Sequence, residues 1–425
     1  MRPCLAGAIL RRVVVVAAMF AAPAVTPLAA AQAQTGEPIK IGLSTQLTGP
    51  LAGNGRQILL TAQIWIEQIN AKGGLAGRPV KLVYYDDRSD PANIPGIYAK
   101  LIDIDRADAL IGVATNMTAA AMPIVIQHHK LMISIASLGV NKQFKYDRYF
   151  QIVPFGPDGK SALSQGFFDV ATSMKPNPKT VALIGADAEF SKTALDGARA
   201  HAVRLELNVV LDRTYPPGTV DFLPIVRSIK AVNPDLVFIA SYPLDTIGML
   251  TAVNEIGLEA KMVGGALVGL SYTALKTKLG EKLNGVVTYS DYVPEPTMKF
   301  PGIEEFLATY QKRATEAGID PLGHEVPPYA YAVLQAFGQA VAATGSTDPA
   351  KVASRMHEVV FKTVVGDVKF GSDGEWAKSR LLTIQFQKVH GNGIAQFNRA
   401  GTMIIVAPPQ YKSGELKYPF AAARN

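Results

Sequence analysis

The 425-residue chain has one cysteine, Cys4, which lies in an N-terminal segment with the layout of a secretory signal peptide. In residues 1–33, three arginines carry the only charges, residues 13–25 are almost wholly apolar, and small residues mark a cleavage site near Ala33. The apolar core is too short to span a membrane, although an N-terminal anchor helix is the alternative. Cleavage would release an exported chain without cysteine, which excludes disulfide bonds and thiol catalysis.

Clusters of one charge sign and long apolar runs are also missing. Loss of the three signal-peptide arginines leaves 39 Lys and Arg against 35 Asp and Glu, a net charge of +4, with no dense Lys/Arg run. This balance argues against a nucleic-acid partner. After residue 33, no stretch reaches the roughly 18 consecutive apolar residues of a membrane span. The remaining length of about 392 residues predicts a soluble protein of two domains, at about 100–200 residues each.

Catalytic and metal-binding signatures are absent as well. The chain has no G-x-S-x-G motif, no H-E-x-x-H motif and no phosphate-binding lysine motif. His128 and His129 are adjacent, so their rings do not share one helix face. Gly53 and Gly55 lie between a strand and a helix, as in a dinucleotide site, but Ile58 stands where the third glycine would be. We therefore predict no catalytic residue, no metal and no cofactor.

The stretch from Pro38 to Asn70 organises what is present. Apolar residues alternate from 39 to 43, a polar, glycine-rich loop runs from 44 to 55, and apolar residues recur at helical spacing from 58 to 69. A strand, a loop and a helix in this order begin an α/β sheet, whose ligands bind at the carboxyl ends of the strands. The helix N-terminus there suits an acidic or polar small molecule. This first loop is a candidate binding site, with a plain connection as the alternative.

The alternation of strand and helix continues along the chain and then starts again. Continuous apolar strands predict a parallel sheet covered on both faces, and the second set predicts a second sheet. The predicted fold class is therefore α/β, with two doubly wound parallel-sheet lobes. Asp86 and Asp87 close the second strand, where we expect a solvated pair. The predicted strands are 80–85, 109–113 and 131–136 in the first set, 181–185, 209–211, 236–240, 262–265 and 286–289 in the second, and antiparallel strands at 364–370 and 381–389.

Several short runs occur in a recognisable order: IKIGLSTQLTGPLAG, YYDDRSDP, TNMTAAAMP and LMISIAS, then VALIGAD, DLVFIASYP, MVGGALVG and VVGDVKFGSDGEWA. Together they resemble the leucine/isoleucine/valine-binding branch of the type I periplasmic solute-binding proteins of ABC importers, over nearly the whole mature chain. The resemblance implies two lobes joined by three crossings, with lobe 1 at about 38–153 plus 293–360 and lobe 2 at about 154–292 plus 361–415. It also implies a monomer, not an enzyme, that closes on a small-molecule ligand and passes it to an ABC permease.

The resemblance further implies a ligand site between the lobes. In the family's amino-acid binders, the helix after the third strand holds the ligand carboxylate, and a small residue and a hydroxyl follow the fourth strand. An aromatic residue lies in their first loop, where this chain has Asn54. Phe190 and Tyr242 match aromatic positions of the second lobe, with core packing as the alternative for both rings. The other predicted contacts are Gln46 in the first loop, Thr115, Asn116 and Met117 after the third strand, and Ala136 and Ser137 after the fourth. Ala136 and Ser137 are the small residues here, and Leu138 occupies the usual hydroxyl position.

One departure from the family pattern bears on the ligand. The amino-acid binders carry, within the run MVGGALVG, a glutamate that pairs with the ligand ammonium, whereas this chain has Ala266 followed by Leu267. A buried ammonium without a partner is costly by several kcal/mol. We therefore predict a small carboxylate without an α-amino group; an aromatic one would stack near Phe190 and Tyr242.

Alternatives remain for both the ligand and the role. A branched-chain or other amino acid would still bind if another carboxylate, such as Asp187, Glu189 or Asp245, paired with its ammonium. The same clamp would also serve as a ligand-sensing module for a membrane receptor, or as an exported enzyme that uses the cleft. A neighbouring permease gene distinguishes transport from sensing, and consumption of the ligand distinguishes an enzyme.

Overall fold

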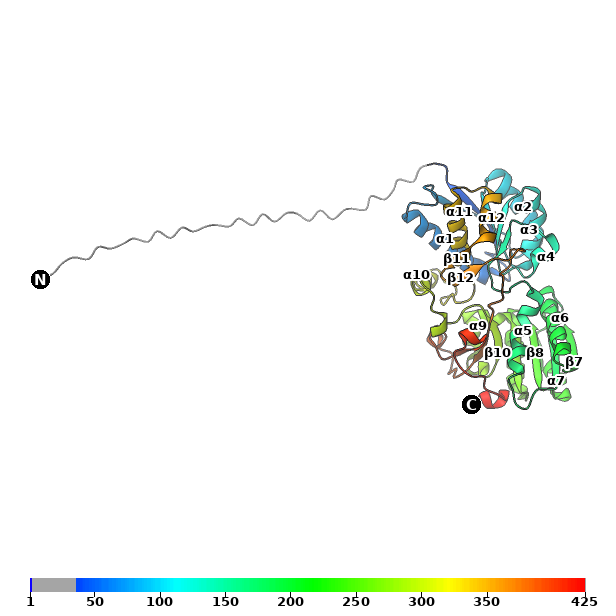
Figure 1. Cartoon of the computed structure of the whole chain (residues 1–425). Coiled ribbons are helices and arrows are strands. Elements are labelled where there is room, and N and C mark those ends of the chain that lie inside the picture. Colours follow the sequence, from blue (N-terminus) through cyan, green and yellow to red (C-terminus); the bar gives the residue numbers. More distant parts are fainter. Residues whose placement is uncertain (2–35, 425) are drawn as a thin grey trace.

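The computed structural model describes Met1 and residues 36–424. Apart from Met1, the predicted signal peptide lies outside the described residues. Figure 1 shows two lobes, one above the other. The upper one, lobe 1, contains a five-stranded sheet, and the lower one, lobe 2, contains a seven-stranded sheet. No helix in residues 36–424 combines the length and apolar character that crossing a bilayer requires.

Lobe 1 is built on a parallel sheet with the strand order β2-β1-β3-β4-β5. Every residue of β3 and β4 is buried, as expected for continuous apolar strands covered on both faces. Helices α11 and α12 come from late in the chain and return to this lobe (Figure 1). The elements are β1 (Ile39–Thr45), α1 (Ala52–Ala71), β2 (Val80–Asp86), α2 (Ile94–Ala99), β3 (Ala109–Val113), α3 (Thr115–Gln127), β4 (Leu131–Ile135), α4 (Val140–Phe144), β5 (Tyr149–Gln151), α10 (Ile303–Glu316), α11 (Val326–Thr344) and α12 (Pro349–Glu358).

Lobe 2 is built on a mixed sheet with the strand order β14-β13-β10-β9-β8-β6-β7. Strands β6, β7, β8, β9 and β10 are parallel. Strand β13 runs antiparallel to both β10 and β14. The antiparallel strand predicted at 381–389 is confirmed. The elements are α5 (Gly159–Ala171), β6 (Thr180–Ala186), α6 (Glu189–Arg204), β7 (Asn208–Tyr215), α7 (Leu223–Val232), β8 (Leu236–Ser241), α8 (Pro243–Ile256), β9 (Met262–Leu267), α9 (Thr273–Leu279), β10 (Val287–Ser290), β13 (Leu382–Phe386), β14 (Met403–Ala407) and α13 (Phe420–Ala423).

A separate antiparallel pair, β11 (Val360–Thr363) and β12 (Gly366–Lys369), corrects one predicted boundary. This hairpin packs on α11. Phe370, which follows it, lies against Phe150 of β5 with ring centroids 5.2 Å apart. Residues 361–370 therefore pack with lobe 1, and the predicted start of the lobe 2 tail at residue 361 comes too early. The cause is aromatic packing between distant segments, which no local pattern reveals.

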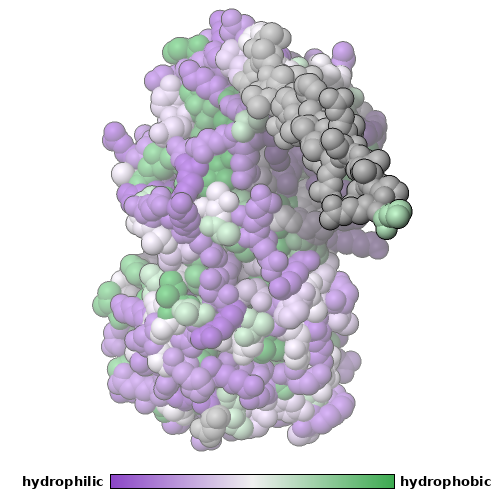
Figure 2. All heavy atoms as spheres, turned by 90° about the vertical axis from the view of Figure 1, so that its left-hand side faces the viewer, coloured by the Kyte–Doolittle hydropathy of each residue, from purple (hydrophilic) through white to green (hydrophobic). Residues whose placement is uncertain are grey.

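Three segments connect the lobes: residues 152–158 between β5 and α5, 291–302 between β10 and α10, and 370–381 between β12 and β13. Turned by 90°, the molecule again shows two masses that meet in the middle (Figure 2). The face in this view is mostly hydrophilic, and its hydrophobic residues form small, separate patches. The two-lobed α/β fold that the sequence predicts is thus confirmed.

The connecting segments are tied to one another. Arg380 N donates to Pro154 O at 2.9 Å, and the indole N–H of Trp376 donates to Ile152 O. Both bonds join the first and third segments. The Arg380 guanidinium also lies 5.2 Å from the centre of the Phe300 ring, which belongs to the second segment.

Candidate ligand-binding site

The carboxyl ends of β3 and β4 lie side by side in lobe 1 and have an unusual backbone. Val113 of β3 pairs with Ile135 of β4, and the residues after them, Ala114 and Ala136, have φ values of +66° and +57°. Alanine rarely adopts this region. Each such residue costs on the order of 1–3 kcal/mol, and such strain gathers at functional sites. Ala136, a predicted site residue, therefore lies at the strained carboxyl edge of the lobe 1 sheet. Ala114 lies at the same edge, and the sequence patterns did not single it out.

Helix α3 begins at Thr115, directly after this edge. Its first intrahelical hydrogen bond joins Thr118 N to Ala114 O at 3.0 Å, so the N–H groups of its first three residues are available to an anion. Asn116 is exposed in this turn. Met117 is buried in the core beside α3, so only its backbone fits the predicted role and its side chain is core packing.

Ser137 is fully buried, and its hydroxyl is already engaged. The Oγ atom lies 2.8 Å from Thr118 Oγ1 and also bonds to Ser134 Oγ. Leu138 N donates to Thr115 Oγ1 at 3.0 Å, which ties the loop after β4 to the start of α3. Ser137, predicted as a small residue of the site, therefore supports the edge of lobe 1 from inside through its hydroxyl, and a direct contact with a ligand stays a prediction.

The end of β1 and the start of α1 form the first predicted loop. Gln46 is fully buried, and its Nε2 donates to Asp87 Oδ2 at 2.9 Å. Its Oε1 is buried without a hydrogen-bond partner in the described part of the chain. Gly55 permits this packing, because a Cβ there would lie 1.9 Å from Gln46 O. Asn54 lies next to Gly55, half-buried. Gln46 thus braces the loop, and only its Oε1 remains for a ligand.

The expectation of a solvated carboxylate pair at the end of β2 is wrong for Asp87. Asp87 is fully buried and accepts hydrogen bonds from Ser44 Oγ and Gln46 Nε2. Burial raises the pKa of Asp87, and its hydrogen bonds oppose this rise only in part. Asp86 is half-buried and accepts a hydrogen bond from Leu47 N at 2.9 Å. The cause is the pairing of β1 with β2, which brings polar groups of the first loop to both carboxylates.

In lobe 2, the two predicted aromatic residues lie side by side with their rings edge to face. Phe190 lies in the first turn of α6 and Tyr242 directly precedes α8. Their ring centroids are 5.9 Å apart with an interplanar angle of 70°, and Phe190 N donates to Tyr242 OH at 3.3 Å. Both rings pack against the core, but both are only half-buried. Part of each ring is therefore available to a ligand.

Strand β9 carries Ala266, the position that the resemblance matches to the glutamate of the family's amino-acid binders. Ala266 is fully buried and pairs with Ala240 of β8. Leu267, at the end of the strand, is buried as well. This position therefore offers a ligand only apolar surface and no carboxylate.

The three alternative carboxylates have other surroundings. Asp187 is exposed and pairs with Lys192 Nζ at 2.6 Å. Asp245 accepts a hydrogen bond from Tyr215 OH at 3.2 Å, and Glu189 is exposed. None of these three carboxylates is fully buried, so each would meet a ligand ammonium in competition with water or an existing partner.

Sequence reasoning missed a group of buried polar residues where the lobes meet. Asp291 follows β10, and its backbone N donates at 3.0 Å to Glu325 Oε2, at the start of α11. Both residues are 7% exposed, and burial, reinforced by the charge of Glu325, raises the pKa of Asp291 well above its usual range. Burial also raises the pKa of Glu325, and the charge of the buried Lys276 on α9 opposes this rise. Only Asp291, a polar residue after an apolar strand, had a local signal.

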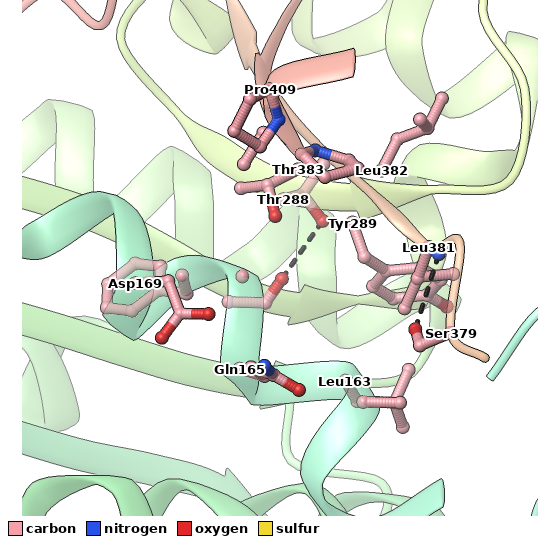
Figure 3. Close-up of a pocket in the computed structure, with 16 residues that line it drawn as sticks. Leu163, Gln165, Asp169, Thr288, Tyr289, Ser379, Leu381, Leu382, Thr383 and Pro409 are labelled. Atoms are coloured by element: carbon pink, nitrogen blue, oxygen red, sulfur yellow. Dashed lines mark hydrogen bonds between the residues drawn. The ribbon is translucent and has the colours of Figure 1, made fainter. Parts of the chain in front are cut away.

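A cavity of about 200 Å³ lies within lobe 2 and is distinct from the predicted contacts, none of which lines it. It is bounded by α5, β10, β13 and the end of the third connecting segment; Figure 3 shows Leu163, Tyr289 and Leu381 around it. Within residues 36–424, no three His, Cys, Asp or Glu side chains are placed to hold a metal.

Comparison with known proteins agrees with this arrangement. The family model for periplasmic binding proteins matches residues 38–388. The chain belongs to this family. The leucine-, isoleucine-, valine-, threonine- and alanine-binding protein of Pseudomonas aeruginosa is 27% identical to this periplasmic binding protein over 381 residues, which cover 87% of this chain and 95% of the relative. The predicted leucine/isoleucine/valine-binding branch is thereby confirmed, and with it a substrate-binding protein of the branched-chain amino acid type of ABC transporter.

Solved structures share the fold of this periplasmic binding protein. A putative branched-chain amino acid ABC transporter protein from Silicibacter pomeroyi has a TM-score of 0.75 at 21% identity, covering 90% of this chain and 99% of that chain. A solute-binding protein of an ABC transporter from Rhodopseudomonas palustris HaA2, solved in complex with p-hydroxybenzoic acid, has a TM-score of 0.70 at 21% identity, covering 88% and 98%. The ligand named for the Rhodopseudomonas palustris protein is an aromatic carboxylate, whereas the Pseudomonas aeruginosa relative is named for amino acids.

Proposed function

We propose that this periplasmic binding protein captures a small carboxylate without an α-amino group and delivers it to an ABC permease in the cytoplasmic membrane. The fully buried Ala266 carries the proposal, because an ammonium at this position would have no partner. The first turn of α3 supports a ligand carboxylate at lobe 1. The half-buried rings of Phe190 and Tyr242 support an aromatic ligand at lobe 2.

The proposed mechanism is closure of the lobes rather than chemistry. A ligand that contacts both lobes binds the closed arrangement more tightly than the open one, and this difference shifts the population. The chain acts as a monomer in the periplasm after cleavage near Ala33. An exported enzyme would consume its ligand, so unchanged ligand after long incubation, followed by NMR, is the expected result.

A thermal-shift panel on the mature protein tests the proposed ligand class. Ligand at about 100 times its dissociation constant adds roughly 2.7 kcal/mol of stability, which raises the melting temperature by a few degrees. We expect a shift with aromatic or aliphatic carboxylates that lack an amino group, and none with leucine, isoleucine or valine. A shift with these amino acids alone would overturn the ligand class and leave the transport role standing.

An amino acid is the second candidate ligand. The observation in its favour is the Pseudomonas aeruginosa relative, which is named for five amino acids. In this case a carboxylate other than one at position 266 would have to pair with the ammonium, and the panel above separates the two candidates directly.

A further inference from the structure

Tyr272 lies where lobe 2 meets lobe 1. It follows β9 and precedes α9, and its ring rests on Gly53 in the first turn of α1. A Cβ on Gly53 would lie only 2.8 Å from Tyr272 Cε1, so a larger residue there would displace the ring. Asn54, next to Gly53, leaves the first loop without an aromatic side chain. A ring from the opposite lobe therefore lies against the start of α1.

A contact between the lobes holds Tyr272 in this position. The next residue, Thr273, donates from its backbone N to Asp320 Oδ2 at 2.8 Å and from its Oγ1 to Asp320 Oδ1 at 2.7 Å. Asp320 lies in the loop between α10 and α11, and this loop is itself ordered by a hydrogen bond from Leu322 N to Asp320 Oδ1 at 3.1 Å. The orientation of Tyr272 is thus fixed on both sides, by Gly53 beneath the ring and by Asp320 at the next residue.

The hydroxyl group of Tyr272 has no evident structural purpose. It is buried, and nothing in residues 36–424 forms a hydrogen bond with it. An unsatisfied buried polar group costs about 1–3 kcal/mol, and a phenylalanine would pack on Gly53 equally well. Burial, with the charge of Asp320 as the smaller cause, raises the pKa of Tyr272 to about 12. The group therefore keeps its proton at neutral pH and is a hydrogen-bond donor.

We propose that Tyr272 is a specificity-determining residue of the ligand site and that its O–H donates a hydrogen bond to the ligand. This inference rests on the proposed function and narrows the ligand class. It selects small carboxylates that carry a second oxygen, a hydroxyl or a carbonyl, at the end away from the carboxylate. Tyr272 follows β9, the strand that carries Ala266. The same edge of lobe 2 would therefore give the site both an apolar surface, at Ala266, and a hydrogen-bond donor, at Tyr272.

Matched ligand pairs and the variant Tyr272→Phe test this inference by calorimetry. The probes are benzoate with 4-hydroxybenzoate, and pentanoate with 4-oxopentanoate. We expect the wild-type protein to bind the oxygenated member of at least one pair about tenfold more tightly, the value of one hydrogen bond. Tyr272→Phe should abolish this preference while the melting temperature without ligand stays equal or rises, because an unsatisfied hydroxyl is removed.

Tyr98→Phe is the matched control. Tyr98 is buried in lobe 1, and its OH donates to Ile111 O at 2.8 Å. This variant should lower the melting temperature and keep the ligand preference, the reverse of the result for Tyr272→Phe. Gly53→Ala, which displaces the Tyr272 ring, should reduce the preference as well.

The outcomes separate this inference from the proposed function. If the wild-type protein binds both members of each pair equally, or if Tyr272→Phe keeps the preference, the role of Tyr272 is overturned and the carboxylate assignment stands. If the wild-type protein binds only amino acids, both fail together.

Discussion

The two sides of the candidate site are made in different ways. In lobe 1 the features are those of the backbone: positive φ angles at Ala114 and Ala136 and the free N–H groups of α3. In lobe 2 the features are side chains, the rings of Phe190 and Tyr242 and the apolar Ala266. Contacts made by the backbone persist through many side-chain substitutions. Contacts made by side chains change with a single substitution. Under the proposed function, we therefore expect the lobe 1 side to set the chemical group that is bound, and the lobe 2 side to select among the molecules that carry this group.

The largest effect is expected from Ala266→Glu, which changes the lobe 2 side. A carboxylate at this fully buried position has no positive partner, so the free energy of unfolding should fall by about 3–5 kcal/mol without ligand. Leucine, whose ammonium would pair with the new carboxylate, should restore part of this loss. Denaturant unfolding with and without leucine measures both changes.

Ala266→Gln is the control for size without charge. Leucine should stabilise Ala266→Glu and leave Ala266→Gln unchanged. Equal stabilisation of both variants by leucine would show that charge at position 266 does not decide the ligand class.

A smaller effect is expected from Asn116→Asp, which changes the lobe 1 side. The residue is exposed in the first turn of α3, where a negative charge stabilises the helix by about 0.3–1 kcal/mol. The same charge repels a ligand carboxylate, so affinity should fall about tenfold at a separation of several ångströms. Calorimetry and thermal melting should thus move in opposite directions. The uncharged control Asn116→Ser should change neither the affinity nor the melting temperature. Unchanged affinity in Asn116→Asp would show that the ligand carboxylate does not bind at the start of α3.

The smallest effect is expected from Ala114→Gly. Glycine adopts a φ of +66° without strain, so the variant should gain about 1 kcal/mol of stability, after subtraction of the entropy that glycine loses on folding. Ala119→Gly, in the interior of α3, makes the same chemical change and should lose about 1 kcal/mol. Denaturant midpoints compare the two variants, and a loss in both would mean that the edge of lobe 1 is not strained.

The fold was open to prediction because its signals are local. Continuous apolar strands alternate with amphipathic helices, and this pattern predicts both sheets, including the antiparallel strand β13. The resemblance to the family, rather than this pattern, singled out Phe190 and Tyr242, whose rings lie edge to face in lobe 2. The secondary structure of a segment can be predicted from its own sequence when local residue patterns determine it.

What failed depends on contacts between distant segments. Asp87 is buried because Ser44 and Gln46 reach it from the neighbouring strand end, and Tyr272 meets Gly53 across two lobes. The chain around each of these residues carries no sign of its partner. The boundary of lobe 2 was misplaced for the same reason, since only the packed structure brings the segment after α12 to β5.

The bonds among the connecting segments have a mechanical consequence. Arg380 and Trp376 fasten the third segment to the first, and the Arg380 guanidinium rests on Phe300 of the second. If the lobes close as proposed, we expect the three joined segments to bend together and the lobes to turn as two rigid bodies about a shared hinge axis. In such a rotation, a small displacement beside the axis would grow with distance from it and be largest at the outer rim of each lobe. A ligand of a few atoms would then set the distance between two protein surfaces far larger than itself.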